Sequence, residues 1–160
     1  MSEHQARVQW NRGEDAFTGA LYSRTHTWSF DGGASFRASA SPANVRVPLS
    51  DPSLVDPEET FVASLASCHM LVFLHVAALR GLVVDAYDDA ASGYLLPMED
   101  GRLVLGRIVL RPAVTFSPTT RATPSLLSDL HLAAHHGCFL ANAVRSEITI
   151  EPRPASAPQP

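Results

Sequence analysis

Two cysteines are the residues of this chain best suited to chemistry. The sequence has 160 residues, and Cys68 and Cys138 are its only thiols. A thiolate can attack an oxidant, exchange with a disulfide or bind a metal. The alternative is a pair of inert thiols, because free cysteine is among the most buried residue types. We therefore treat both positions as candidate redox residues.

The histidines near Cys138 suggest a rival, a zinc site. His131 and His135 are four residues apart, which places them one turn apart on a helix, and His136 follows directly. Two such histidines and the two thiols are the ligand types of a tetrahedral zinc site. The spacing permits a structural zinc protein without specifying one.

Composition limits the classes of protein that this chain can belong to. The formal net charge of −4 and the pI near 5.9 argue against a nucleic-acid partner. All twelve basic residues are arginine, which excludes lysine Schiff bases, pyridoxal phosphate anchoring and a Walker A loop. Only 18% of residues are charged and 46% are hydrophobic. We therefore expect an oligomer that hides apolar surface.

The first ten residues and the longest apolar segment indicate where in the cell the protein is expected. The first ten residues contain no apolar core of a signal peptide, so we expect a cytoplasmic protein, where a permanent disulfide is disfavoured. Residues 60–79 lack Asp, Glu and Arg over the length of a membrane span. They contain two histidines and two serines, so we expect no membrane partner.

A long helix carries Cys68. Asp56 is suited to the N-cap and Pro57 to the first helical position, and we expect the helix to run to about Arg80 and to end at Gly81. Apolar residues cover nearly every side of it. Such a helix is buried all round, at the centre of the fold or at a subunit interface.

A second helix leads to Cys138. It is predicted to begin near Thr123 and Pro124 and to break at Gly137, after which residues 138–144 form a short helical piece. In the first turn of a new helix, the dipole would lower the pKa of the Cys138 thiol. On the residues alone, Cys138 therefore competes with Cys68 for the role of attacking thiol.

The remaining chain predicts an α+β fold with a largely antiparallel sheet around the long helix. We expect one domain over residues 1–151 and a flexible, proline-rich tail over residues 152–160. The expected strands cover residues 8–10, 18–30, 35–40, 83–96, 103–116 and 145–151, with an irregular connection over residues 41–55.

The segment from Asp56 to Cys68, DPEETFVASLASC, resembles the OsmC/Ohr family of osmotically inducible and organic hydroperoxide resistance proteins. That family has an Asn-Pro-Glu helix start with a cysteine ten residues after the glutamate. The segment GCFLANAV at Gly137–Val144, followed by a last strand, supports the resemblance, which extends over about residues 18–151. The resemblance implies an OsmC-like fold and an intertwined homodimer.

The resemblance also implies a cofactor-free thiol peroxidase that reduces organic hydroperoxides. Cys68 would attack the peroxide and become a sulfenic acid, and Cys138 would resolve it as a Cys68–Cys138 disulfide. An external dithiol, lipoyl-linked in parts of the family, would reduce that disulfide. His69 and Phe139 follow the two cysteines where many members have Phe and Pro, so substrate or reductant preference can differ.

Activation of Cys68 requires a cation. Cys68 lies twelve residues past Asp56, beyond the reach of the helix dipole. In the family an arginine from the N-terminal strand region is held by the glutamate that matches Glu58. Arg24 is the nearest match for that arginine and Arg37 the next. The alternative interpretations are a solvated strand residue for Arg24 and a capping carboxylate for Glu58.

Two further functions stay open at this point. The first is a redox-sensing or apolar-ligand-binding protein that has the OsmC-like fold without efficient catalysis. The second is the structural zinc protein described above.

Overall fold

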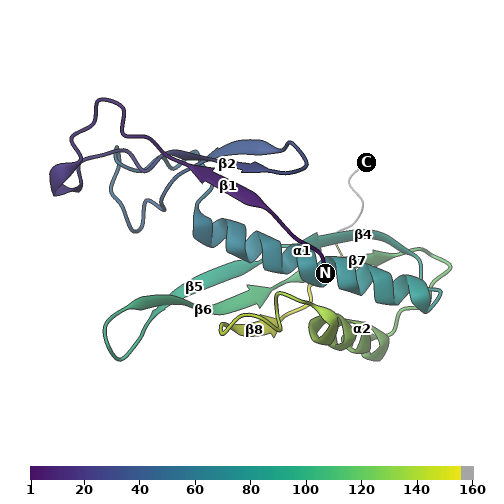
Figure 1. Ribbon diagram of the computed structural model, residues 1–160. Helices are drawn as coiled ribbons and strands as arrows, with labels where there is room; N and C mark the ends of the chain where they lie inside the picture. Colours follow the sequence, from purple (N-terminus) through teal and green to yellow (C-terminus); the bar gives the residue numbers. More distant parts are fainter. Residues whose placement is uncertain (156–160) are drawn as a thin grey trace. The chain divides into compact units, whose positions relative to one another are not determined.

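The computed structural model describes residues 1–155, which divide into two compact units, Met1–Thr60 and the chain from Phe61 onward. The elements, labelled in Figure 1, are β1 (Ala6–Gln9), the 3-10 turn η1 (Thr18–Ala20), β2 (His26–Phe30), β3 (Ser35–Ala38), α1 (Pro57–Leu79), β4 (Val84–Asp89), β5 (Ser92–Pro97), β6 (Leu103–Leu110), β7 (Pro112–Phe116), α2 (Pro124–Gly137) and β8 (Glu147–Ile150).

The first unit holds a three-stranded antiparallel sheet in the order β1-β2-β3. The expected strand over residues 18–30 is wrong in its first half, because only His26–Phe30 is extended. Gly19 and Ala20 adopt positive φ values of 76° and 58°, a left-handed conformation that no strand accommodates. The chain therefore turns there, and residues 21–25 reach β2 as an irregular segment.

The start of α1 is fixed by a reciprocal cap. Glu59 N donates to Asp56 Oδ1 at 2.8 Å, and Asp56 N donates to Glu59 Oε2 at 3.0 Å. This exchange satisfies two amides that the first turn of a helix leaves unpaired. The helix ends two residues before Gly81, whose φ of 71° is the left-handed conformation of a helix terminus. Both predicted ends of the helix are confirmed.

The second unit contains the strands that follow α1. β4 pairs with β7, and β5 and β6 pair antiparallel, with β8 parallel beside β6. The two long strands expected over residues 83–96 and 103–116 are each interrupted, the second at Arg111. There Arg111 N donates to Asp89 Oδ1 at 2.6 Å, so a side chain replaces the backbone partner. The α+β class is confirmed, and the parallel β8 is the exception to the antiparallel prediction.

α1 forms the core of the second unit through two clusters. Toward its start, Val62 and Leu65 pack with Ile108 and Leu110 of β6. Toward its end, Phe73 packs with β7 and α2 residues in a second cluster. Other apolar positions of α1 are exposed, with Leu71 at 60% and Leu79 at 75%. Within the single chain the helix is therefore not buried all round, as the sequence had suggested it would be.

α1 is also the only described helix long and apolar enough to cross a membrane. Its buried residues pack against strands and α2 of the same chain. A core helix passes the same test of length and composition, so this finding is weak evidence for a membrane span.

The chain after β8 stays attached at least to Arg153. Its amide donates to Pro112 O at 2.8 Å, and its Nη2 forms an ion pair of 2.7 Å with Asp88 Oδ2. The tail predicted to begin at Pro152 is thus held at its start. Residues 156–160, which complete that prediction, lie outside the described residues.

Candidate active site

The two thiols meet in the second unit. Cys68 lies in the middle of α1, Cys138 directly follows α2, and both belong to the cluster around Leu65 and Ile108. Neither is in a disulfide. A hydrogen bond joins their side chains and contributes to the raised pKa of Cys138. Two cysteines 70 positions apart are therefore in direct contact through their thiols.

The surroundings of Cys138 disfavour its thiolate form. Its side chain is fully buried, whereas Cys68 is half-buried. Burial first, and then the hydrogen bond with Cys68, raises the pKa of the Cys138 thiol above its ordinary value. The backbone N–H of Ala141, which donates to Cys138 Sγ at 3.4 Å, acts in the opposite direction but does not reverse the shift.

The predicted helical setting of Cys138 is wrong. Cys138 is the C-cap of α2, with φ −74° and ψ 113°, and residues 139–143 form turns. A thiol at this position lies at the negative end of a helix, where the dipole does not favour a thiolate. The lowered pKa expected from a helix N-terminus is replaced by a raised one.

A close approach of α2 to α1 fixes the second thiol beside the first. A Cβ built on Gly137 would stand 2.8 Å from Val72 Cγ1 on α1. Asn142 then fastens the chain beyond the helix, since its Nδ2 donates to the carbonyls of His136 and Cys138 at 2.9 and 2.8 Å. The glycine of the Gly-Cys pair thus has a packing role.

Two histidines, one of them next to Cys68 in the sequence, form a buried pair. His69 Nε2 lies 3.1 Å from His131 Nδ1, and the two rings stack at 5.4 Å between centroids. Burial lowers the pKa of each ring to about 4, and for His69 the neighbouring His131 and His135 add to the effect. Both rings are therefore neutral at pH 7. The pairing of His69 with His131 was not anticipated from the sequence.

The structure gives the zinc interpretation no support. Within residues 1–155, no group of three or more His, Cys, Asp or Glu side chains is arranged to hold a metal ion. His131 faces His69 instead of a shared metal position with the thiols.

Arg24 and Glu58 lie in the first unit and are engaged separately. Glu58 Oε1 accepts a hydrogen bond from Asn44 Nδ2 at 3.3 Å. The guanidinium of Arg24 lies 3.7 Å from the centre of the Tyr22 ring. Across the described residues, no ion pair joins the two side chains. Arg37, the second candidate arginine, is exposed on β3.

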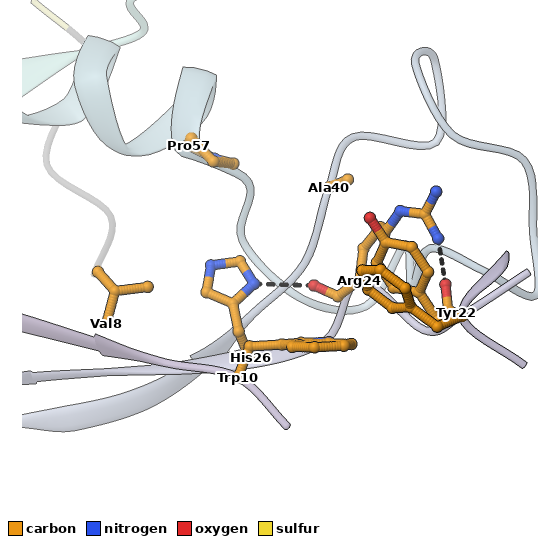
Figure 2. A pocket seen from close by; sticks show the side chains of 8 residues that line it. Val8, Trp10, Tyr22, Arg24, His26, Ala40 and Pro57 are labelled. Carbon is orange, nitrogen blue, oxygen red and sulfur yellow. Dashed lines mark hydrogen bonds between the residues drawn. The ribbon is translucent and has the colours of Figure 1, made fainter. Parts of the chain in front are cut away.

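Arg24 lines a pocket of about 500 Å³ that lies wholly within residues 1–60. We call it the aromatic pocket. Figure 2 shows Arg24 with Tyr22 at one end and Val8 with Pro57 at the other, and His26 between them. The lining residues are Val8, Trp10, Phe17, Tyr22, Arg24, His26, Ala40 and Pro57. The sequence analysis did not anticipate this pocket, because its lining residues are spread from Val8 to Pro57 and share no local pattern.

Comparison with known proteins identifies relatives of the whole chain. The family model described as OsmC-like protein matches residues 50–153. An OsmC-like protein of unknown function from Vibrio cholerae is 50% identical, with 96% of this chain and 100% of that chain covered and a TM-score of 0.92. No protein with a curated description is detectably similar in sequence.

Two more distant structures share the fold. An organic hydroperoxide resistance protein OsmC from Legionella pneumophila is 16% identical, covers 98% of each chain and has a TM-score of 0.69. The organic hydroperoxide resistance protein OhrB of Bacillus subtilis is 18% identical, with 95% of this chain and 98% of that chain covered and a TM-score of 0.67. At these low sequence identities, the likeness shows a shared fold and nothing more.

Proposed function

The chain belongs to the OsmC-like protein family, and from that premise we propose that it is a thiol peroxidase for organic hydroperoxides. The observation that carries the proposal is the direct contact of two free thiols, Cys68 and Cys138. Two relatives of the same fold are named as organic hydroperoxide resistance proteins. A redox role related to peroxides is what this family membership supports.

The first step uses Cys68. Its thiolate attacks the terminal oxygen of the hydroperoxide, the O–O bond breaks, the OH group stays on sulfur, and the alkoxide leaves and takes up a proton from solvent to give the alcohol. Cys68 becomes a sulfenic acid. The assignment follows from accessibility and basicity, because Cys138 is fully buried and its pKa is raised. An apolar surrounding of Val62, Leu65 and Ile108 suits an alkyl or aryl peroxide better than a strongly hydrated one.

The second step uses Cys138. Its thiolate attacks the sulfenic sulfur of Cys68, the S–O bond breaks, the hydroxide leaves and takes up a proton as water, and the disulfide forms. The thiols already share a hydrogen bond, so little movement is needed. A dithiol then reduces the disulfide by exchange and is itself oxidised to a disulfide. A reducing cytoplasm, expected from the sequence, would supply such a reductant.

The resemblance to the family also implies roles for Arg24 and Glu58. We assign Arg24 the role of the cation that stabilises the Cys68 thiolate, with Glu58 as the residue that orients it. Replacement of Arg24 by glutamine is expected to slow the reaction of Cys68 with peroxide at pH 7 and to move its rate profile to higher pH. The same substitution at Arg37 decides between the two arginines. Only replacement of the arginine that stabilises the Cys68 thiolate is expected to shift the pH–rate profile.

We also propose that the chain acts as a homodimer. The exposed apolar residues of α1, Phe61, Leu71 and Leu79 among them, offer surface that a second copy can cover. Sedimentation equilibrium is expected to give about twice the 17.2 kDa of the chain. A monomer at micromolar concentration would contradict this part of the proposal.

The test of the peroxidase is steady-state consumption of cumene hydroperoxide with dihydrolipoamide as the reductant. Cys68→Ser is expected to abolish turnover. Cys138→Ser is expected to leave one turnover and a sulfenic acid on Cys68 that dimedone traps. Ser67→Ala, at an exposed neighbouring position of α1, is the matched control and should keep the rate. Full turnover by Cys68→Ser would overturn the assignment.

A second candidate function is favoured by one observation, the aromatic pocket. An OsmC-like ligand-binding protein without efficient catalysis would show slow, non-saturating peroxide consumption together with tight binding of an apolar ligand. Saturating peroxidase kinetics would remove this candidate as the main function.

A further inference from the structure

The walls of the aromatic pocket are three aromatic rings in mutual contact. The Tyr22 ring lies 4.8 Å from Phe17 and 5.2 Å from Trp10 between centroids, and Trp10 lies 6.0 Å from Phe17. Trp10 is 40% exposed and Phe17 is 54% exposed. Apolar rings gathered at an open pocket gain stability when an apolar body covers them.

Arg24 places a fixed cation at one end of these walls (Figure 2). Its Nη1 donates to the carbonyl oxygens of Ala20, at 3.1 Å, and Tyr22. These bonds and the stacking on the Tyr22 ring hold the guanidinium in one orientation. The other two nitrogens, Nε and Nη2, make no hydrogen bond within residues 1–155. They are the pair that binds a carboxylate side-on with two parallel hydrogen bonds.

The charge of Arg24 is also unmatched. None of the ion pairs formed by the described residues involves it. A cation beside aromatic rings that pairs with no carboxylate of residues 1–155 is suited to receive an anion. Because a single arginine supplies the charge, one planar carboxylate fits better than a phosphate group, which calls for more donors.

His26 provides a second polar group in the same pocket. Its Nδ1 lies 2.8 Å from the carbonyl oxygen of Arg24. A carbonyl only accepts, so Nδ1 carries the proton of the neutral ring and Nε2 is left as an acceptor. Among the described residues Nε2 has no hydrogen-bond partner, so it is available to a polar group of a ligand.

We propose that the aromatic pocket binds a small carboxylic acid with an apolar body. The carboxylate pairs with Nε and Nη2 of Arg24, and the body covers Trp10, Phe17 and Tyr22. A pocket of about 500 Å³ is within the range of small-molecule sites. The site requires no thiol chemistry and goes beyond the peroxidase proposal. If Arg24 also serves Cys68, a consequence that rests on that proposal, the bound acid slows peroxide reduction.

The test compares two probes of equal shape on the full-length, reduced protein. 4-Phenylbutanoate and 4-phenylbutan-1-ol are titrated by calorimetry, with tryptophan fluorescence as a second readout that Trp10 makes sensitive. The carboxylate is expected to bind at least about tenfold more tightly, the effect of charge-assisted hydrogen bonds. Equal affinity for the two probes, or no binding of the carboxylate at millimolar concentration, would overturn the proposal.

Variants then assign the preference to Arg24. Arg24→Gln is expected to lower the affinity for the carboxylate about tenfold and to leave that for the alcohol unchanged. Arg7→Gln makes the same charge change on β1, one residue from Val8 but outside the lining, and should keep the preference. Loss of the preference in Arg7→Gln, or its survival in Arg24→Gln, would refute the assignment. Should Arg24→Gln fail to fold, the wild-type comparison decides alone.

Neither probe carries a peroxide bond, so the result is independent of the peroxidase. If the protein binds phenylbutanoate but does not reduce peroxide, the carboxylate site is supported and the peroxidase function is contradicted. If the protein reduces peroxide but does not prefer the carboxylate, the peroxidase function is supported and the carboxylate site is contradicted.

Discussion

Acid should destabilise the fold through the buried pair of His69 and His131. Both rings are almost fully buried, and their pKa values are lowered to about 4 from the ordinary value near 6.5. In the unfolded chain each ring takes up its proton near pH 6.5. The native pair thus contributes stability that is complete above pH 6.5 and is lost as the pH falls toward 4.

The size of this loss follows from the shift. A lowering of about 2.5 pKa units, at 1.36 kcal/mol for each unit, corresponds to about 3 kcal/mol for one ring. A small domain has a total stability of roughly 5–15 kcal/mol. The loss of one such contribution therefore brings the protein a considerable way toward unfolding by pH 4.

Urea denaturation between pH 7 and pH 4, followed by circular dichroism, measures the effect. The double variant His69→Phe, His131→Leu should lose at least about 3 kcal/mol less over this range than the wild type. His75→Gln, an exposed histidine on the same helix, is the matched control and should behave as the wild type. Equal losses in the wild type and the double variant would refute the reasoning.

Two other outcomes can be checked separately. Cys68 should react with a maleimide before Cys138, because Cys138 is fully buried and its pKa is raised; peptide mass spectrometry at short times reads the order, and earlier labelling of Cys138 would contradict it. Gly93→Ala should cost about 1–3 kcal/mol in urea denaturation, because the new Cβ would lie 2.5 Å from Val62 Cγ2. Gly32→Ala, with nothing within 4 Å and no positive φ, should change stability little.

The parts of the fold that depend on local signals could be predicted from the sequence. Asp56 and Glu59 cap α1 through their own side chains, and Gly81 ends it by its own conformation. α2 is similar, since Thr123 Oγ1 accepts from Leu126 N at 3.2 Å. These determinants lie within four residues of each other, so the pattern alone carries them.

The parts that depend on distant contacts could not be predicted in the same way. Residues 18–25 have the composition of a strand, but Gly19 and Ala20 adopt left-handed conformations that composition cannot predict. The pairing of His69 with His131 joins two elements 62 positions apart. The end of α2 at Gly137 was predicted correctly, but residues 139–143 form turns and not the short helical piece expected after it.

The candidate site, too, depends on contacts between residues that are distant in the sequence. The contact between Cys68 and Cys138 was expected only through the resemblance to a family, since no local pattern brings them together. The aromatic pocket depends on residues from β1, β2, the first residue of α1 and the segments that connect them, which meet only in the folded unit.

The measurement that tests the central claim most directly is a thiol titration of the reduced protein, with intact mass, before and after one equivalent of cumene hydroperoxide. The account predicts that both thiols disappear within seconds, faster than with hydrogen peroxide, that the mass falls by two hydrogens, and that a dithiol restores both thiols. Survival of both thiols for many minutes would contradict the peroxidase proposal and leave the OsmC-like fold without that chemistry.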